Sequence, residues 1–301
     1  MILAAGYGTR LRPISYTLPK PMMPLGGRPL IAWLVESLLG FAVSEIIVNL
    51  HHLPQTIERY LPSQFPEAHF HFSFEPEILG TGGGVRKVRA LLEREEDFFL
   101  LNSDTFQSPQ FENLRHARRS ANAIAAMTLR HPPAGDRYTA VWEENGMVTG
   151  IGRGRGESLM FSGSHCVSSR VFRYIPDRDL SEMTGHVYQP LVDSGREPIA
   201  AIIDDNPMWF DIGTPLRYLT ASRAFSTMIG NSVVEGDVRD TVVWDNCYIA
   251  RGVVLESCIV AHGVEIRTPM RLQNAIICRD DPAIPRDADY RFENGLVIAC
   301  I

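Results

Sequence analysis

The sequence predicts an α/β protein with a mainly parallel sheet covered by helices, followed by a short left-handed β-helix. Short β-branched or aromatic runs alternate with amphipathic segments up to about residue 225, which is the pattern of such a sheet. Large aliphatic residues then recur every six positions, which is typical of a β-helix. We therefore expect two domains, at residues 1–229 and 230–301.

The composition excludes several classes of protein. The chain has 301 residues, of which 45% are hydrophobic, and a formal net charge of −6. Its arginines are spread along the sequence, so no basic patch for nucleic acid is expected. The five cysteines include no Cys-x-x-Cys pair, and no apolar run reaches the length of a membrane helix. We expect a cytoplasmic protein with free thiols, no nucleic-acid partner and no membrane association.

The elements of the first domain follow from apolar spacing. Strands are expected at residues 46–50, 70–74, 98–102 and 123–127, and helices at 29–39, 84–92 and 214–229. The first strand has only the residues before Gly6, which is short for a central parallel strand. The short strand leaves open whether the natural start lies upstream of Met1.

The β-helix is predicted from three phased repeats. Val243, Ile249 and Leu255 are six residues apart, with turn-forming residues between them, and Ala261 breaks the phase. A small antiparallel β appendage is the alternative. Tails of the β-helical kind often mediate self-association, so a homo-oligomer formed through residues 230–301 is also expected.

A glycine turn and several cations at the start of the chain predict a phosphate site. Gly6 and Gly8 have no Cβ to block the approach of an anion to the backbone N–H groups. Arg10 offers forked donors, and Lys20 is held between two prolines, so its ammonium is pre-positioned. Leu11 stands where a dinucleotide fingerprint has its third glycine, and no P-loop lysine follows.

Two aspartates end apolar runs and predict a magnesium site. Asp104 follows one predicted strand, and Asp211 ends another apolar run in the same way. Ligands of open α/β sheets lie beyond the carboxyl ends of strands, and Mg²⁺ prefers oxygen ligands, including those of substrate phosphates. Taken alone, each aspartate is better interpreted as a helix cap or turn residue. Together with the phosphate turn, the two aspartates favour a metal site.

Four glycines in the five positions 80–84 predict a loop at the entry of a helix. Each glycine would cost a helix interior about 1 kcal/mol, so the run favours close approach of the backbone to a flat or anionic group. A nucleotide base lying on this loop is the functional interpretation. An ordinary helix-entry loop is the alternative.

Taken together, these motifs resemble those of the sugar-1-phosphate nucleotidyltransferase superfamily. The residues that carry the resemblance occur in the order of that family: Gly6-Tyr-Gly-Thr-Arg-Leu-Arg-Pro13, Pro19-Lys-Pro21, Gly80-Thr-Gly-Gly83, Asn102-Ser-Asp104, Phe161-Ser-Gly163 and Trp209-Phe-Asp-Ile-Gly213. The resemblance implies a Rossmann-like, mixed sheet of the GT-A kind. It also implies transfer of a nucleoside monophosphate from an NTP to a sugar 1-phosphate, with release of pyrophosphate.

The resemblance further implies roles for individual residues. Arg10, Lys20, Asp104 and Asp211 would be catalytic, and the two aspartates would hold Mg²⁺. The nucleotide would be bound by Ala5, Gly6, Gly8, Thr9, Gly82, Gly83 and Gly84. The sugar phosphate would be bound by Ser162, Gly163 and Arg153.

One segment departs from the family pattern. Many relatives carry a Glu-Lys-Pro whose lysine grips the sugar phosphate, whereas residues 152–156 here read Gly-Arg-Gly-Arg-Gly. Arg153 or Arg155 would have to supply the charge, and a planar guanidinium is not equivalent to an ammonium. The N-acetylmuramate-1-phosphate uridylyltransferase and mannose-1-phosphate guanylyltransferase branches are both similar, so UTP and GTP both stay open.

Two other functions compete with this one. A catalytically silent paralogue would bind a nucleotide-sugar and regulate a partner, which the altered segment 152–156 favours and the retained Lys20 disfavours. A nucleotide-sugar-dependent glycosyltransferase would use Asp104 as its metal ligand but would have no use for Arg10 beside Lys20.

Overall fold

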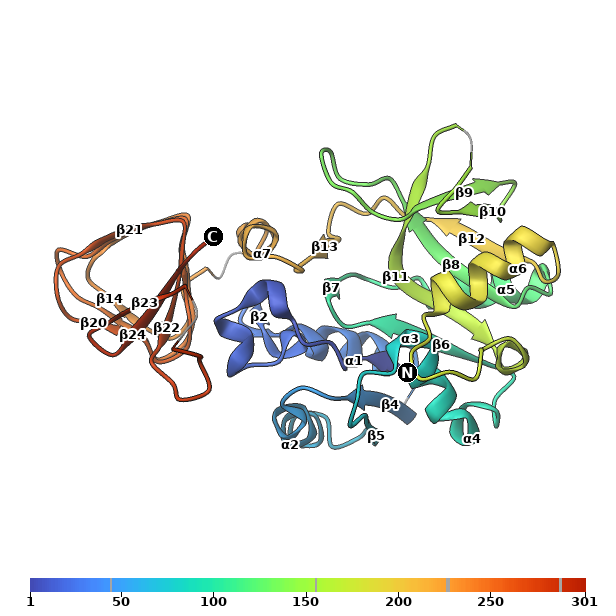
Figure 1. The fold of residues 1–301 in the computed structure, drawn as a ribbon, viewed down its shortest axis with the longest axis horizontal. Helices are drawn as coiled ribbons and strands as arrows, with labels where there is room; N and C mark the ends of the chain where they lie inside the picture. Colours follow the sequence, from blue (N-terminus) through green and yellow to red (C-terminus); the bar gives the residue numbers. More distant parts are fainter. Residues whose placement is uncertain (44, 155, 226–227, 287–288) are drawn as a thin grey trace.

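A nine-stranded sheet lies at the centre of the N-terminal part of the chain (Figure 1). The computed structural model describes residues 1–43, 45–154, 156–225, 228–286 and 289–301. The strand order is β5-β4-β1-β6-β11-β8-β12-β10-β9. These strands are β1 (Ile2–Leu3), β4 (Glu45–Leu50), β5 (His69–Phe74), β6 (Asp97–Asn102), β8 (Ala125–Arg130), β9 (Ala140–Glu144), β10 (Met147–Ile151), β11 (Leu159–Ser168) and β12 (Ile199–Ile203).

The sheet is mixed, and its parallel part carries the predicted strands. Strands β5, β4, β1 and β6 pair in parallel, as do β8 and β12. The long strand β11 runs antiparallel between β6 and β8. The α/β class is therefore confirmed, and each of the four strands expected by residue range is present with its bounds shifted by at most three residues.

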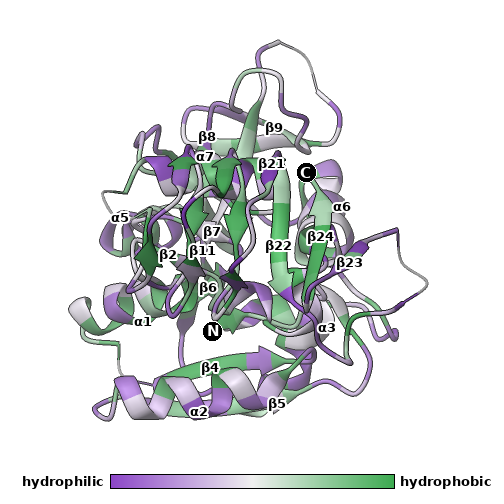
Figure 2. Ribbon diagram, turned by 90° about the vertical axis from the view of Figure 1, so that its left-hand side faces the viewer, coloured by the Kyte–Doolittle hydropathy of each residue, from purple (hydrophilic) through white to green (hydrophobic). Residues whose placement is uncertain are grey.

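Helices cover both faces of this sheet, because successive apolar side chains of its central strands point to opposite faces and both faces must be buried. In β6, Phe98 and Leu100 pack on one face, while Phe99 and Leu101 pack on the other. The face of Phe99 is covered by α1 (Leu30–Gly40), α2 (Pro54–Gln64) and α5 (Phe111–Ser120). The opposite face is covered by α3 (Gly80–Lys87), α4 (Arg89–Leu92) and α6 (Gln189–Ser194). Figure 2 shows the resulting contrast between the apolar strand β4 and the largely polar surface helix α2.

Two predicted helix boundaries are wrong. The helix expected at 84–92 begins at Gly80 and is interrupted at Val88, so the glycine run is itself the start of α3. The helix expected at 214–229 is α7 (Pro215–Arg223), which Thr214 caps by accepting the N–H of Arg217. Residues 226 and 227 of the expected range lie outside the described residues. In both cases tertiary contacts override the apolar spacing along the chain.

The C-terminal residues form a coil of three parallel sheets. The sheets are β14-β17-β20, β15-β18-β21 and β16-β19-β22, and two antiparallel strands, β24 and β23, extend the last of them. Their bounds are β14 (Val233–Val234), β15 (Asp237–Arg239), β16 (Val242–Val243), β17 (Tyr248–Ile249), β18 (Val254–Glu256), β19 (Ile259–Val260), β20 (Glu265–Ile266), β21 (Arg271–Gln273), β22 (Ala275–Arg279), β23 (Arg291–Glu293) and β24 (Leu296–Cys300).

The coil explains why the six-residue phase breaks. Val243 pairs with Val260, Ile249 with Ile266 and Leu255 with Leu272, so each full coil advances 17 residues and one step per coil is five residues instead of six. The position that Ala261 would fill in a strict repeat is filled by Val260, which is fully buried. The parallel pairing disfavours the antiparallel appendage for these coils.

Helix α7 joins the coil to the sheet domain (Figure 1). The Trp244 indole N–H donates to the Tyr218 hydroxyl at 2.8 Å, and that hydroxyl in turn donates to the carbonyl of Pro24. Pro24 begins the small hairpin of β2 (Pro24–Leu25) and β3 (Arg28–Pro29). The coil, α7 and the segment that carries Lys20 therefore share one apolar cluster.

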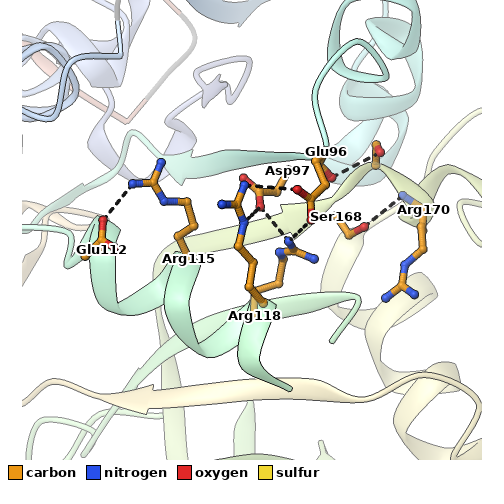
Figure 3. A network of polar contacts seen from close by, with 9 residues as sticks. Glu96, Asp97, Glu112, Arg115, Arg118, Ser168 and Arg170 are labelled. Carbon is orange, nitrogen blue, oxygen red and sulfur yellow. Dashed lines mark hydrogen bonds and ion pairs between the residues drawn. The ribbon is translucent and has the colours of Figure 1, made fainter. Parts of the chain in front are cut away.

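A charged cluster fastens α5 to the sheet at the edge where β6 begins (Figure 3). The Arg118 side chain is only 4% exposed and pairs with Glu96 and Asp97 at 2.8 Å each. Arg119 also pairs with Asp97, at 2.8 Å. Because these residues lie at the start of β6, whereas Asp104 follows its end, the cluster is structural and separate from the site described below.

The five cysteines are free thiols, and all but Cys300 are buried. Burial raises the pKa of Cys166 to about 12, so this thiol stays protonated and unreactive. Within the described residues, no helix is both long enough and apolar enough to cross a bilayer.

Candidate active site

A pocket of about 340 Å³ opens beyond the carboxyl ends of β1, β4 and β6. Its lining includes residues from each of the predicted motifs at the start of the chain, after β6 and before α7. These residues are Ala5, Gly6, Gly8, Thr9, Arg10, Lys20, Asn102, Asp104 and Gly213. A second cavity, of about 380 Å³, lies between α7 and the coil, and none of the predicted site residues lines it. The first pocket is therefore the candidate active site.

The glycine turn is shaped for contact with a ligand. Gly8 has a φ of 62°, which favours glycine, and a Cβ there would lie 3.3 Å from Lys20 Cβ. A Cβ at Gly6 would meet nothing within 4 Å, so Gly6 has an open face. The turn thus holds Lys20 from one side and leaves the backbone at Gly6 accessible.

Lys20 and Asp104 form an ion pair at the pocket. Lys20 Nζ donates to Asp104 Oδ2 at 3.0 Å, and the lysine side chain is 11% exposed whereas the aspartate is 43% exposed. The prolines on both sides of Lys20 restrict its backbone, as predicted. The lysine is therefore fixed and largely dehydrated, while the carboxylate keeps room for another ligand.

Asp211 lies beside Asp104 because two short strands pair. β13 (Phe210–Asp211) is antiparallel to β7 (Thr105–Phe106), with Asp211 opposite Thr105. The Ile212 N–H also donates to the Asp104 carbonyl at 3.1 Å. Two aspartates about a hundred residues apart in sequence are thereby brought to neighbouring strand ends.

The carboxylate of Asp211 is enclosed by three donors, two of which, Tyr138 and Arg217, lie outside the sequence motifs. The Gly213 N–H donates to Oδ1 at 2.6 Å, and the Tyr138 hydroxyl and the Arg217 guanidinium both donate to Oδ2. Burial, with the nearby Asp211 charge, raises the pKa of Tyr138, so its hydroxyl stays protonated and can donate. Arg217 could have been found from the sequence, because it lies six residues after Asp211 in the first part of α7. Tyr138 had no such signal.

Arg10 reaches the same place from the glycine turn. A Cβ at Gly213 would lie 2.9 Å from Arg10 Nη2 and 2.8 Å from Asp211 Oδ1. The absence of a side chain at Gly213 therefore lets the guanidinium approach the strand end that carries Asp211. Lys20, Arg10 and Arg217 thus place three cations around two carboxylates.

The glycine-rich start of α3 lies partly at the pocket and partly against protein. Gly80 and Thr81 line the pocket, but Gly82, Gly83 and Gly84 do not. A Cβ at Gly82 would lie 2.8 Å from Ser181 Oγ, and one at Gly84 would lie 2.8 Å from Glu75 Oε1. These glycines therefore permit close packing of α3 against the chain, a structural reason that the sequence alone did not show.

Three polar residues at this end of the pocket were missed. Glu182 Oε2 accepts the Thr81 hydroxyl at 2.7 Å and the Thr81 N–H at 3.2 Å. Glu75, fully buried, accepts the Asn49 amide at 2.8 Å. All three side chains come from segments without a recognisable motif, so nothing in the local sequence marked them.

The predicted sugar-phosphate residues are not brought together. Gly163 lies next to Asp104's turn, since a Cβ there would be 3.0 Å from Thr105 Oγ1. Ser162 is buried, and its hydroxyl donates to the Thr128 carbonyl at 3.0 Å. Arg153 is 74% exposed, pairs with Asp193 at 2.6 Å and does not line the pocket, and Arg155 lies outside the described residues.

The donor set suits a hard divalent cation. Asp104 lines the pocket, and Asp211, which does not line it, lies on the adjoining strand. The described residues contain no cluster of three or more His, Cys, Asp or Glu side chains that could enclose a metal alone. Mg²⁺ commonly takes one or two carboxylates together with phosphate oxygens and water. The two aspartates therefore fit such an ion in the presence of a phosphate-bearing substrate.

Comparison with known proteins identifies a family. The sequence model of the family described as "Nucleotidyl transferase" matches residues 1–227. A UTP–glucose-1-phosphate uridylyltransferase of Synechocystis is 29% identical over 93% of this chain and 79% of its own length. A mannose-1-phosphate guanyltransferase of Emericella nidulans is 28% identical over 76% of this chain, which spans 64% of that relative's length.

The fold has solved counterparts. The crystal structure of HddC from Yersinia pseudotuberculosis, complexed with GMP-PN, superposes with a TM-score of 0.61 at 23% identity, over 74% of this chain and 97% of that one. This likeness concerns the fold.

Proposed function

Since the chain belongs to the nucleotidyl transferase family, we propose that it transfers a nucleoside monophosphate from UTP or GTP to a sugar 1-phosphate, releasing pyrophosphate. One observation carries the proposal. A largely buried lysine is ion-paired to Asp104 at the glycine turn, with Asp211 on the adjoining strand end. Relatives named as uridylyl- and guanylyltransferases support both nucleotides.

In the proposed reaction the protein must bring together two anions, the NTP and the sugar 1-phosphate, which repel each other. A phosphate oxygen of the sugar phosphate attacks the α-phosphorus of the NTP in line, and the pyrophosphate oxygen leaves from the opposite side. That nucleophile is already ionised at neutral pH, so no general base is required. Positioning and charge neutralisation then lower the barrier, by up to about 7–11 kcal/mol for proximity in favourable systems.

The residues of this chain divide that work. The backbone at Gly6 and Gly8 approaches the nucleotide phosphates, and Arg10 and Lys20 neutralise the phosphoryl oxygens that must meet. Asp104 and Asp211 would hold Mg²⁺, which supplies Lewis-acid polarisation of the α-phosphate when bound.

We place the base and the sugar by the same reasoning. The base would lie by the start of α3, where Gly80 and Thr81 face the pocket and the predicted Gly82–Gly84 segment packs behind them. The sugar would lie towards Gly163, beside the turn that carries Asp104. Ser162 would support this region through its backbone, because its hydroxyl is already bound within the protein.

The test is a screen of purified protein with five NTPs and a panel of sugar 1-phosphates, reading pyrophosphate release. Release with UTP or GTP and one sugar 1-phosphate supports the proposal. Binding of a nucleotide-sugar without pyrophosphate release from any pair would favour the silent paralogue. Sugar transfer to an acceptor without pyrophosphate would favour a glycosyltransferase.

We also propose that residues 1–229 form the catalytic domain and residues 230–301 a left-handed β-helix that mediates self-association. The 17-residue repeat of parallel strands supports a helical coil. Light scattering of the full chain and of a chain ending at residue 229 tests the association.

We also propose a cytoplasmic location, since four buried free thiols suit a reducing compartment.

A further inference from the structure

Asp211 is held by a group of side chains that no motif explains. Arg217 Nη1 and the Tyr138 hydroxyl donate to Oδ2, and the carboxylate is only 12% exposed. The other guanidinium nitrogen, Nη2, contacts Asp136 Oδ1 at 2.8 Å. We call Asp136, Tyr138 and Arg217 the Asp211 clasp.

The clasp ties together three separate parts of the domain. Asp136 and Tyr138 lie in the connection between β8 and β9, Asp211 ends β13, and Arg217 lies on α7. The Arg217 guanidinium also lies over the Tyr138 ring, with its central carbon 5.1 Å from the ring centroid. Two carboxylates and an aromatic ring therefore surround the guanidinium, and the Arg217 side chain is only 24% exposed.

Each of the two aspartates therefore has its own cationic partner. Asp104 is paired with Lys20, and Asp211 is paired with Arg217. A metal ion that binds Asp211 Oδ2 would have to displace one of the two donors on this oxygen. The two lone pairs of Oδ2 are both in use, by Tyr138 and Arg217, and Arg217 is the cationic one of these donors, so it is the donor that competes most directly with a divalent cation for the charge of this oxygen.

We propose that Arg217 is the resident counter-ion of Asp211 and competes with the divalent cation for its carboxylate. The inference rests on the proposed function, because it takes Asp211 as a metal ligand. Arg217 is a positioning residue in this account: it keeps Asp211 neutralised until the cation arrives with the substrate phosphates. Release from Asp211 then frees Arg217 Nη1, while Nη2 stays paired with Asp136.

The experiment measures binding of Mn²⁺ alone to the full chain, by electron paramagnetic resonance, without nucleotide. Arg217→Gln should bind Mn²⁺ about two- to fivefold more tightly than the unsubstituted protein, as expected for loss of a partly exposed competing ion pair. Arg217→Lys keeps the charge without the fork and should give a smaller gain. Arg115→Gln is the matched control, since Arg115 pairs with Glu112 at 2.8 Å on α5 and should leave Mn²⁺ affinity unchanged.

A further variant separates charge competition from simple opening of the loop. Asp136→Asn leaves the Arg217 contact with Asp211 in place and loosens only the β8–β9 connection. Our proposal expects no tighter Mn²⁺ binding in Asp136→Asn. Equal tightening in Asp136→Asn and Arg217→Gln would overturn it, because the loop and not the guanidinium would then limit access.

The outcomes also separate this inference from the proposed function. If the unsubstituted protein releases pyrophosphate but Arg217→Gln binds Mn²⁺ no more tightly, the inference alone fails. If no NTP and sugar 1-phosphate pair gives pyrophosphate and neither protein binds Mn²⁺, both fail. Circular dichroism of each variant shows whether it is folded, and Arg217→Lys carries the test if Arg217→Gln does not fold.

Discussion

Replacing Lys20 by methionine removes the cation at the centre of the site while keeping an unbranched side chain of similar length. The structure predicts a small effect on folding. Asp104, the partner at 3.0 Å, is 43% exposed, so water can solvate its carboxylate once the ammonium is gone. An ion pair with one partly exposed partner contributes about 0–1 kcal/mol to the free energy of unfolding, and Lys20→Met should cost no more than that.

The effect on turnover should be far larger. Two unit charges 4 Å apart interact by about 4 kcal/mol at an effective dielectric constant of 20. Removing one fixed donor from an active site typically costs about a hundred- to a thousandfold in kcat. We therefore expect Lys20→Met to lose about two to three orders of magnitude in pyrophosphate release, measured with saturating NTP and sugar 1-phosphate.

The control is the other lysine of this chain. Lys87 lies at the end of α3 and donates to the Phe74 carbonyl outside the pocket, so Lys87→Met should retain normal turnover. Urea denaturation of both variants reports the free energy of unfolding. A folded Lys20→Met protein with more than about a tenth of normal turnover would refute the reasoning, because the charge of Lys20 would then not be needed to bring the phosphates together.

Three further predictions concern packing, titration and thiol reactivity. Gly84→Ala places a Cβ 2.8 Å from Glu75 Oε1 and should lower the free energy of unfolding in urea by about 1–3 kcal/mol, whereas Gly40→Ala, with nothing within 4 Å, should not lower it. Burial lowers the pKa of His165 to about 3, so as the pH falls the imidazole takes up a proton in the unfolded chain before it does so in the folded protein. The free energy of unfolding should therefore fall by roughly 2 kcal/mol between pH 7 and pH 5. A pH dependence unchanged in His165→Gln would contradict this. Of the five thiols only Cys300 is exposed, so a thiol reagent should label about one equivalent in native protein, and rapid labelling of more would count against the fold.

The sequence was most informative where one short segment holds a function by itself. The glycine turn, Lys20 between its prolines and the two aspartates at strand ends could all be located, because each depends on local backbone geometry. The prediction that Asp104 and Asp211 meet rested on the topology of open sheets and on the family resemblance, and β7 and β13 bring them to adjoining strand ends.

The sequence was least informative where contacts between distant segments decide the structure. Arg217 and Tyr138 reach Asp211 from α7 and from the β8–β9 connection, and no spacing along the chain relates them. The glycine run was predicted as a loop because glycine destabilises a helix interior. The structure shows that these positions are helical and that close packing against Ser181 leaves no room for a larger side chain. The phase break at Ala261 was visible, but its cause, a five-residue step in a 17-residue coil, needs the strand register.

The most direct test of the account is a crystal of the full chain grown with Mn²⁺ and a nucleoside triphosphate. We predict one anomalous peak within coordination distance of both Asp104 and Asp211, with the triphosphate lying along the Gly6–Arg10 turn towards Lys20. A triphosphate bound elsewhere, or a metal that contacts neither aspartate, would contradict it.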